Sequence, residues 1–357
     1  MGNGSYLNRA SSKWLREDGP ESDIVISSRI RLARNIADLP FTTMGSESVQ
    51  EQVVNAVQQA IQSPALAQMG PFDMLYMGAM NDVSKQVLVE KHLVSPGLVD
   101  TDSAAVVIRP DEEVSVMVNE EDHLRIQVML PGNQLDQAYE LANEVDDAFE
   151  NVIDYAFDEE KGYLTACPTN LGTGLRASLM MHLPALVLTG QINRILSAVT
   201  QVGLTVRGIY GEGSDALGNL FQISNQVTLG HSEQEIIGNL QGVATQIIEH
   251  ERAARQHLLH ENKGNIEDRI SRSFGILAYA RQMGSKEAMQ RLSDVRLGID
   301  LGIIKGVSAG ILKELMVATQ PGFLQQQYGI EMSPAMRDVK RASLIRERLR
   351  MEGMNHD

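Results

Sequence analysis

The chain has 357 residues, a formal net charge of −15 at pH 7, 43% hydrophobic residues and 22% charged residues. This composition is typical of a soluble globular protein with a large core, and the negative charge argues against general binding to nucleic acid or to an anionic membrane. The single cysteine excludes an internal disulfide framework and favours a reducing compartment, so we expect a cytoplasmic protein. No apolar run approaches the length of a membrane span.

Hydrophobic periodicity predicts mixed strands and helices in the first two thirds of the chain and helices beyond residue 258. Strands are expected at 104–109, 114–119, 124–130, 163–167, 204–208 and 219–224. Helices are expected at 47–63, 134–157, 174–188 and 232–260, and then near 265–283, 285–300, 308–320 and 333–350. Because consecutive strands are joined by short loops, we expect an α+β fold with a mainly antiparallel sheet flanked by helices, followed by an all-helical C-terminal domain.

The expected strands at 114–119 and 124–130 enclose the acidic segment Asn119-Glu-Glu-Asp-His123. In both strands apolar residues alternate with other residues, which is the period of a half-buried strand. Arg125 therefore points to the opposite face from Leu124. The pattern predicts a β-hairpin with carboxylates at its tip, and taken alone such a tip would be an ordinary solvated turn.

A second polar segment runs Thr165-Ala-Cys-Pro-Thr-Asn-Leu-Gly-Thr-Gly-Leu-Arg-Ala177. Its last six residues fit the loose glycine pattern of dinucleotide-binding folds. We reject that interpretation, because a loop separates the glycines from the expected strand at 163–167 and no acidic residue follows at the required spacing. The phosphate-binding loop of P-loop proteins and the catalytic motifs of protein kinases are absent from the sequence.

Together the hairpin tip and the Cys167 segment resemble the two signatures of the phosphagen (guanidino) kinases, the family of creatine and arginine kinases. Ser27-Ser-Arg-Ile-Arg31 and Arg207-Gly-Ile-Tyr-Gly-Glu212 resemble two further family segments, in the family's order. The resemblance covers about residues 20–258. It implies an N-terminal lead-in at 1–23, a catalytic domain at 24–258 and a helical C-terminal domain at 259–357.

The resemblance implies a binding site for ATP. The arginines that correspond to the family's cage for the phosphates are Arg29, Arg31, Arg125, Arg176 and Arg207. A guanidinium is permanently charged and donates in a planar fork, so it binds phosphate oxygens bidentately. Neighbouring backbone is expected to line the site at Ser27, Ser28, Ile30, Ala177, Ser178, Leu179, Met180, Gly208, Ile209, Tyr210, Gly211 and Glu212. His92 resembles the histidine that lies against the nucleotide base, although a partly exposed loop histidine is nearly as common.

A guanidinium that acts as a nucleophile is cationic, so carboxylates must fix its plane and accept the proton that it loses. The resemblance assigns Glu121 as catalytic base and anchor and Glu212 as the second carboxylate, and Glu212 favours arginine over creatine. Cys167 is expected to lie beside the same guanidinium and to assist, and Glu120 and Asp122 are candidates for supporting positions. Mg²⁺ is expected to be held by the nucleotide, so no metal ligand is assigned to the protein.

One position departs from the family pattern. In Ser224-Asn-Gln-Val-Thr-Leu-Gly230 the family often carries a basic residue near Thr228. We therefore expect the phosphate contact to be weaker there or to be supplied by another residue.

The Ser27–Arg31 segment lies near the first residue, so the helical domain with which phosphagen kinases enclose a small substrate is expected to be missing. An uncovered cleft admits an arginine that is still part of a polypeptide. With its added helical tail, the chain resembles the bacterial protein-arginine kinases. This implies a transferase that phosphorylates exposed arginines in proteins during stress responses and marks them for Clp-type degradation. The implied partners are protein substrates, an activating adaptor, a stress-gene repressor, a Clp chaperone and further copies of the chain.

Residues 333–350 carry six Lys or Arg and two Asp or Glu, for which a solvated basic helix is the ordinary explanation. The segment Arg337-Asp-Val-Lys-Arg-Ala342 also resembles a phosphoarginine pocket with which the family senses its product. Arg337 and Arg341 are four residues apart and share one face of a helix. Arg337, Asp338 and Arg341 are therefore the candidate ligands of a regulatory, allosteric site.

Two alternatives stay open. The first is a kinase for free arginine or another small guanidino compound, which the missing domain disfavours. The second is a non-catalytic adaptor that binds nucleotide or phosphoarginine. The carboxylates at Glu121 and Glu212 argue against the adaptor, because simple binding of a nucleotide does not require them.

Overall fold

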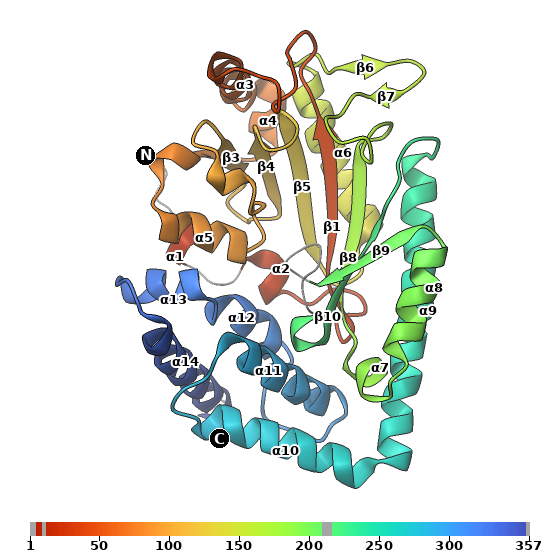
Figure 1. The fold of residues 1–357 in the computed structure, drawn as a ribbon, viewed down its shortest axis with the longest axis vertical. Coiled ribbons are helices and arrows are strands. Elements are labelled where there is room, and N and C mark those ends of the chain that lie inside the picture. The colour runs from red at the N-terminus through yellow and green to blue at the C-terminus, as the bar shows by residue number, and fades with distance from the viewer. Residues whose placement is uncertain (1–4, 9–11, 209–215, 355–357) are drawn as a thin grey trace.

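The computed structural model describes residues 5–8, 12–208 and 216–354, and its centre is one eight-stranded sheet (Figure 1). The strands are ordered β2, β3, β4, β5, β1, β8, β10, β9, and all neighbouring pairs are antiparallel. Their bounds are β1 Val25–Arg34, β2 Asp73–Tyr76, β3 Ala105–Ile108, β4 Val114–Val118, β5 Leu124–Pro131, β8 Leu175–His182, β9 Leu204–Gly208 and β10 Leu220–Asn225. A separate hairpin joins β6 (Phe157–Asp158) to β7 (Gly162–Tyr163). The expectation of a mainly antiparallel sheet is confirmed.

Helices flank this sheet, as expected for an α+β fold. Those that contribute buried residues to the main core are α3 (Glu47–Ala60), α4 (Pro64–Gln68), α6 (Leu135–Glu150), α7 (Pro184–Leu188), α8 (Ile192–Gln201), α9 (Glu233–Glu261), α10 (Lys263–Tyr279) and, through Leu297, α11 (Ser285–Asp300). The N-terminal part adds α1 (Ser5–Asn8), α2 (Lys13–Arg16), α5 (Asp82–Glu90) and the 3₁₀ turns Met77–Ala79 and Leu98–Asp100, and a third such turn is Leu217–Asn219. Among the described residues, no helix is both long and apolar enough to cross a membrane.

In the described part of the C-terminal third, every secondary-structure element is a helix. After α10 come α11 (Ser285–Asp300), α12 (Ile311–Ala318), α13 (Pro321–Tyr328) and α14 (Pro334–Met354), which lie below the sheet in Figure 1. They enclose a second core together with Trp14, Ile26, Met129 and Met180. The Lys313 ammonium on α12 also donates to the Glu17 carbonyl at 2.7 Å and to the Asp18 carboxylate at 2.8 Å. The N-terminal lead-in is thereby tied to the C-terminal helices.

Alternation along the central strands separates an apolar face from a cationic one. In β1, Ile30 and Leu32 are buried in the core with α6 and α9, so Arg29 and Arg31 point to the opposite face. The antiparallel register places Arg31 opposite Arg176 on β8. On the other side of β1, the pairing with β5 places Ala33 opposite Arg125. Arginines that are far apart in the sequence are therefore collected on one face of the sheet.

Two sequence predictions of local structure are wrong. Residues 174–188 were expected to be one helix, but they form strand β8 and the short helix α7. Leu175, Ala177, Leu179 and Met181 are buried and alternate with Arg176 and Ser178, which is the period of a strand. The expected strand at 163–167 contains only the last residue of β7. In addition, the glycines at 172 and 174 precede a strand rather than a helix, which supports the rejection of a dinucleotide-binding loop.

A buried ion pair joins β1 to α6 on the apolar face. The Arg34 guanidinium lies 2.6 Å from the Asp146 carboxylate, and both side chains are almost completely excluded from solvent. Arg34 also donates to the carbonyls of Ala33 and Thr173 and lies 3.5 Å from the centre of the Tyr163 ring. Burial raises the pKa of the Asp146 carboxyl, although the neighbouring Arg34 opposes the rise.

Replacement of Arg34 by Met is expected to lower the free energy of unfolding by about 3–5 kcal/mol, because the variant buries the Asp146 charge without its partner. Loss of the guanidinium raises the Asp146 pKa further in the folded state, so the native protein binds an extra proton and the deficit shrinks as the pH falls. Urea unfolding at about pH 8 and about pH 5.5 measures both effects. The double variant Arg34→Met, Asp146→Leu is the control and should recover part of the loss. A deficit that does not change with pH would contradict this account.

Candidate active site

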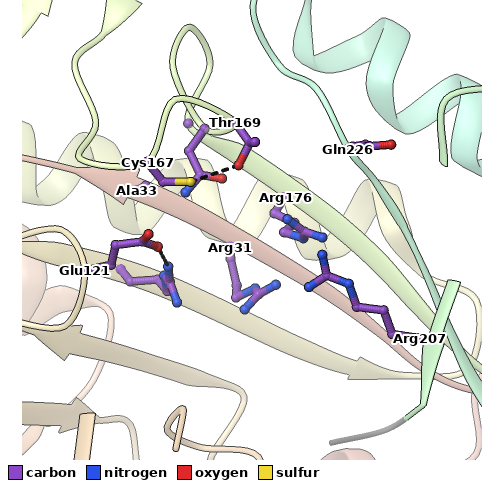
Figure 2. A pocket seen from close by; sticks show the side chains of 11 residues that line it. Arg31, Ala33, Glu121, Cys167, Thr169, Arg176, Arg207 and Gln226 are labelled. Atoms are coloured by element: carbon purple, nitrogen blue, oxygen red, sulfur yellow. Dashed lines mark hydrogen bonds and ion pairs between the residues drawn. The ribbon is translucent and has the colours of Figure 1, made fainter. Parts of the chain in front are cut away.

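The cationic face of the sheet forms the floor of a cavity of about 510 Å³ (Figure 2). Its walls come from β1, β5, β8 and β9, from the hairpin tip and from the loop that contains Cys167. The lining residues are Arg31, Ala33, Glu121, Arg125, Cys167, Thr169, Asn170, Gly174, Arg176, Arg207 and Gln226. A second cavity of about 130 Å³ shares Arg31 and Arg207 with the first and also contains Arg29 and His92. All five predicted arginines therefore line one of two adjoining cavities.

The guanidinium groups in this site repel one another. In Figure 2, Arg31, Arg176 and Arg207 point toward the same space. Burial lowers the pKa of Arg29 to about 10, with smaller contributions from Arg176 and Arg125. Burial and the neighbouring arginines also lower the pKa of Arg31, and its buried Nε has no hydrogen-bond partner among the described residues. An anionic ligand with several oxygens would relieve this repulsion and supply the missing acceptor.

Arg125 pairs with carboxylates at the edge of this cationic face. Its guanidinium lies 2.7 Å from Glu120 and 2.9 Å from Glu121, the two glutamates at the tip of the β4–β5 hairpin. Glu120 also accepts hydrogen bonds from the Ser95 hydroxyl and from the backbone N–H of Glu121. Glu121 lines the cavity, and 41% of its side chain is exposed. Glu120 thus holds the hairpin tip, whereas the Glu121 carboxylate faces the cavity.

Asn35 was missed by the sequence reasoning, although it connects the hairpin to the Cys167 loop. Its amide donates to the Asp122 carboxylate at 2.7 Å and to the Leu164 carbonyl at 2.9 Å, and its carbonyl accepts from the His123 backbone at 2.9 Å. Asp122 is buried and accepts from the Ala166 backbone at 2.7 Å as well. Asp122 is therefore a supporting residue that sets the position of Glu121 relative to the loop. No residue pattern around Asn35 announces this role, because its partners come from distant segments.

The Cys167 loop is held from its other side by Thr228. The Thr228 hydroxyl is buried and lies 2.6 Å from the carbonyl of Leu171 and 3.1 Å from that of Thr169. Cys167 itself is partly exposed, and its sulfur lies 3.0 Å from the Thr169 hydroxyl. Thr228 lies near the position at which the family often carries a basic residue, and its hydroxyl donates to the loop backbone. The neighbouring Gln226 lines the cavity instead.

The remaining predicted nucleotide-site residues differ in whether they line a cavity. His92 is buried at the second cavity, and burial lowers the pKa of its imidazole to about 3, so it is neutral at pH 7. The side chains of Ile30, Ala177 and Leu179 lie in the apolar core and leave only their backbone for a ligand. Ser27, Ser28, Ser178, Met180 and Gly208 line neither cavity. Ile209, Tyr210, Gly211 and the predicted catalytic Glu212 lie outside the described residues.

The candidate regulatory residues Arg337, Asp338 and Arg341 lie on α14 and line neither cavity. The Arg341 guanidinium is buried and donates to the carbonyls of Thr319 and Met283, and it pairs with Asp338 at 2.6 Å. Arg337 donates to the Met332 carbonyl at 2.9 Å. Arg341 therefore joins α14 to the neighbouring helices, and Arg337 and Asp338 are the more accessible members of the set.

Two family models match the chain. The ATP:guanido phosphotransferase, C-terminal catalytic domain, matches residues 49–254, and the Protein-arginine kinase McsB C-terminal domain matches residues 263–357. Among solved structures, lombricine kinase shares the fold with a TM-score of 0.58 and 25% identity, over 67% of this chain and 69% of that chain. A taurocyamine kinase from Schistosoma mansoni has a TM-score of 0.59 at 24% identity, over 67% of this chain and 35% of that chain. Fold and site thus define an ATP:guanido phosphotransferase.

Relatives that match over nearly the full length of the chain identify a narrower family. Proteins named protein-arginine kinase from Brevibacillus brevis and Geobacillus stearothermophilus are each 57% identical, the first over 98% of this chain and 99% of its own length, the second over 99% and 97%. The Bacillus subtilis protein of that name is 54% identical over 97% of this chain and 96% of its own length. The chain belongs to the protein-arginine kinase family.

Replacement of Thr228 by Val tests the anchoring of the Cys167 loop. The variant leaves two carbonyls without their donor, so we expect a loss of about 1–3 kcal/mol in the free energy of unfolding. The loop should also open more often, and alkylation of Cys167 by iodoacetamide should be faster. Because Cys167 is the only cysteine, intact-protein mass spectrometry follows this reaction directly. Thr245→Val, in an exposed part of α9, is the control. Parent-like alkylation of Thr228→Val would show that the hydroxyl does not hold the loop.

Proposed function

We propose that this chain transfers the γ-phosphoryl group of ATP to arginine side chains of proteins. The observation that carries the proposal is that groups of opposite charge line one cavity. Converging guanidinium groups of the sheet lie on one side, and the Glu121 carboxylate at the hairpin tip lies on the other. The cationic part suits a triphosphate, and the carboxylate suits a guanidinium. The full-length relatives named protein-arginine kinase support the choice of arginine in a protein as the acceptor.

In the proposed mechanism, Arg29, Arg31, Arg125, Arg176 and Arg207 bind the phosphates, and His92 lies at the base end of the nucleotide. Arg125 must then exchange its carboxylate partners for phosphate oxygens. This exchange releases Glu121 from the ion pair and leaves it available for the incoming substrate. Nucleotide binding would thereby prepare the acceptor site. The ion pairs of Arg125 with Glu120 and Glu121 thus favour an order in which the nucleotide binds before the acceptor.

The transfer step needs little covalent chemistry from the protein. A guanidinium nitrogen attacks the γ-phosphorus, the bond between that phosphorus and the bridging oxygen of ADP breaks, and the proton lost by the nitrogen passes to Glu121. Glu212 is proposed as the second carboxylate and Cys167 as a neighbour that tunes the guanidinium. Mg²⁺ would neutralise the phosphates while held mainly by the nucleotide. Among the described residues, no group of three or more His, Cys, Asp or Glu side chains is arranged to hold a metal.

The wider roles follow from the family resemblance alone. We propose a catalytic domain at 24–258 and a C-terminal domain at 259–357 with a phosphoarginine pocket. We further propose that the enzyme acts in the cytoplasm, forms homo-oligomers and responds to an adaptor. Its products would mark proteins, among them a stress-gene repressor, for a Clp chaperone and protease.

Incubation with labelled ATP and either casein or free arginine tests the main proposal. An acid-labile, base-stable phosphate on casein, mapped to arginine by mass spectrometry, is the expected result. Efficient labelling of free arginine without labelling of casein would favour a small-molecule kinase instead. Binding of nucleotide without any transfer would favour the non-catalytic adaptor.

Replacement of Glu121 by Gln should lower the rate of transfer by about 10²–10⁴, because the isosteric amide can neither anchor the guanidinium nor accept its proton. Affinity for MgATP, measured by calorimetry, should be retained, since the phosphate-binding arginines are unchanged. Glu47→Gln on the exposed surface of α3 serves as the control. Near-normal turnover of Glu121→Gln would remove this residue from the mechanism.

The proposed regulatory pocket predicts that added phosphoarginine raises the initial rate of the parent. Linkage then requires phosphoarginine to bind the active state more tightly than the inactive one. Arg337→Ala should abolish this stimulation while affinity for MgATP stays the same. Arg341 is not a suitable test position because its buried contacts join α14 to other helices. Arg350→Ala, an exposed cation on the same helix, is the control, and parallel rate curves for Arg337→Ala and the parent would contradict the regulatory role.

A further inference from the structure

The β6–β7 hairpin projects from one end of the molecule (Figure 1), and it is joined by backbone hydrogen bonds to the loop that lines the catalytic cavity. Tyr163 and Gly172 exchange backbone hydrogen bonds, with N···O distances of 2.8 and 3.3 Å. Gly162 packs so closely on Gly172 that a Cβ built at Gly162 would lie 2.5 Å from the Gly172 carbonyl oxygen. Gly172 belongs to the same loop as Cys167, Thr169 and Gly174, which line the cavity. The position of the hairpin is therefore coupled to the wall of the site.

A third segment packs against the same loop from the other side. A Cβ built at Gly172 would lie 3.0 Å from the Cα of Leu229, and the Thr228 hydroxyl lies within hydrogen-bonding distance of two carbonyls of the loop. Gln226, at the start of this turn, lines the cavity. The hairpin, the Cys167 loop and the turn at 226–230 thus form three stacked layers along one edge of the cavity.

The two outer layers expose large apolar side chains. Phe157 is 57% exposed, Val227 52% and Leu229 48%. Phe157 packs edge-to-face on Tyr163, with ring centres 5.2 Å apart, so its ring is held rather than free. Single exposed apolar residues are common, but three on segments that adjoin the cavity-lining loop form a site where burial by a partner is favourable.

The turn of the hairpin is acidic. Asp158, Glu159 and Glu160 are followed by a single cation, Lys161. The Asp158 carboxylate accepts the backbone N–H groups of Glu160 and Lys161, which leaves Glu159 and Glu160 as the exposed carboxylates at the turn. An acidic surface beside the cavity favours a cationic approach.

Building on the proposed function, we propose that these layers form a docking ledge for the polypeptide around the target arginine. An apolar residue near that arginine packs against Phe157, Val227 and Leu229, and basic residues farther along lie near Glu159 and Glu160. A free amino acid has no flanking residues that reach the ledge. The ledge therefore selects a protein acceptor and favours arginines in segments that are both apolar and basic.

Two pairs of peptides test the ledge, each with one arginine. In the first pair the residues that flank the arginine are leucine or glycine, and in the second pair a more distant position is lysine or glutamine. The parent should prefer the leucine and lysine peptides, as judged by KM and by calorimetric binding in the presence of MgADP.

The variants Phe157→Ser and Leu229→Ser should each raise KM for the leucine peptide by roughly fivefold to tenfold. Their kcat values and their KM for the glycine peptide should change little. Glu159→Gln combined with Glu160→Gln should remove the preference for lysine.

Matched controls separate the ledge from general effects on folding. Tyr279→Ser removes an exposed aromatic ring on α10, and the double variant Glu47→Gln, Glu51→Gln removes two exposed carboxylates on α3. Both variants should keep the parent preferences. Circular dichroism and affinity for MgATP show whether each ledge variant is folded. If folded ledge variants keep the parent preferences in turnover and binding, the proposed ledge is wrong. The proposed kinase function would still hold in that case, provided that the parent phosphorylates arginine. If the parent binds the peptides with the expected preferences but phosphorylates none, the kinase function fails and the ledge survives as a binding surface.

Discussion

Repulsion among guanidinium groups on one face of an antiparallel sheet is the constraint on which the rest of this structure depends. Arg29 and Arg31 alternate with core residues in β1, so the same period that buries Ile30 and Leu32 forces both cations to the other side. The register then adds Arg176 from the neighbouring strand. Folding must bury these like charges together, and burial first, with a further contribution from the neighbouring arginines, lowers the pKa values of Arg29 and Arg31. A polyanionic ligand offsets it, which couples stability to ligand binding.

The charge of Arg125 is matched at close range by the two hairpin-tip glutamates. The same residue is also a candidate phosphate ligand. Around it, Asn35 and Asp122 join the hairpin to the Cys167 loop, and Thr228 holds that loop from the far side. Hydrogen bonds between segments that are distant in the sequence therefore set the position of the hairpin tip relative to the loop.

The C-terminal helices are joined to the site region through a short physical path. The Glu90 carboxylate at the end of α5 accepts the backbone N–H groups of Gly322 and Phe323 at the start of α13, each at 2.8 Å. His92, two residues later, lines the second cavity. Arg341 in turn fastens α14 to the carbonyl of Thr319, next to the start of α13. Hydrogen bonds thus connect α14, through the start of α13, to the segment that contains His92.

The sequence by itself determined the local elements with strong periods and proposed the candidate site residues. Alternation at 114–119 and 124–130 predicted the hairpin, and the resemblance of the polar segments to a known family proposed Glu121, Cys167 and the arginines. It misjudged β8, because a strand with one apolar and one cationic face contains enough apolar residues to fit a helical pattern as well. Only the tertiary structure decided the roles of Asn35, Thr228 and Arg341, because a hydrogen bond to a distant carbonyl leaves no period or spacing in the chain. The proposed ledge depends on tertiary structure in the same way, since the segments of Phe157 and Leu229 come together only through the close packing around Gly162 and Gly172.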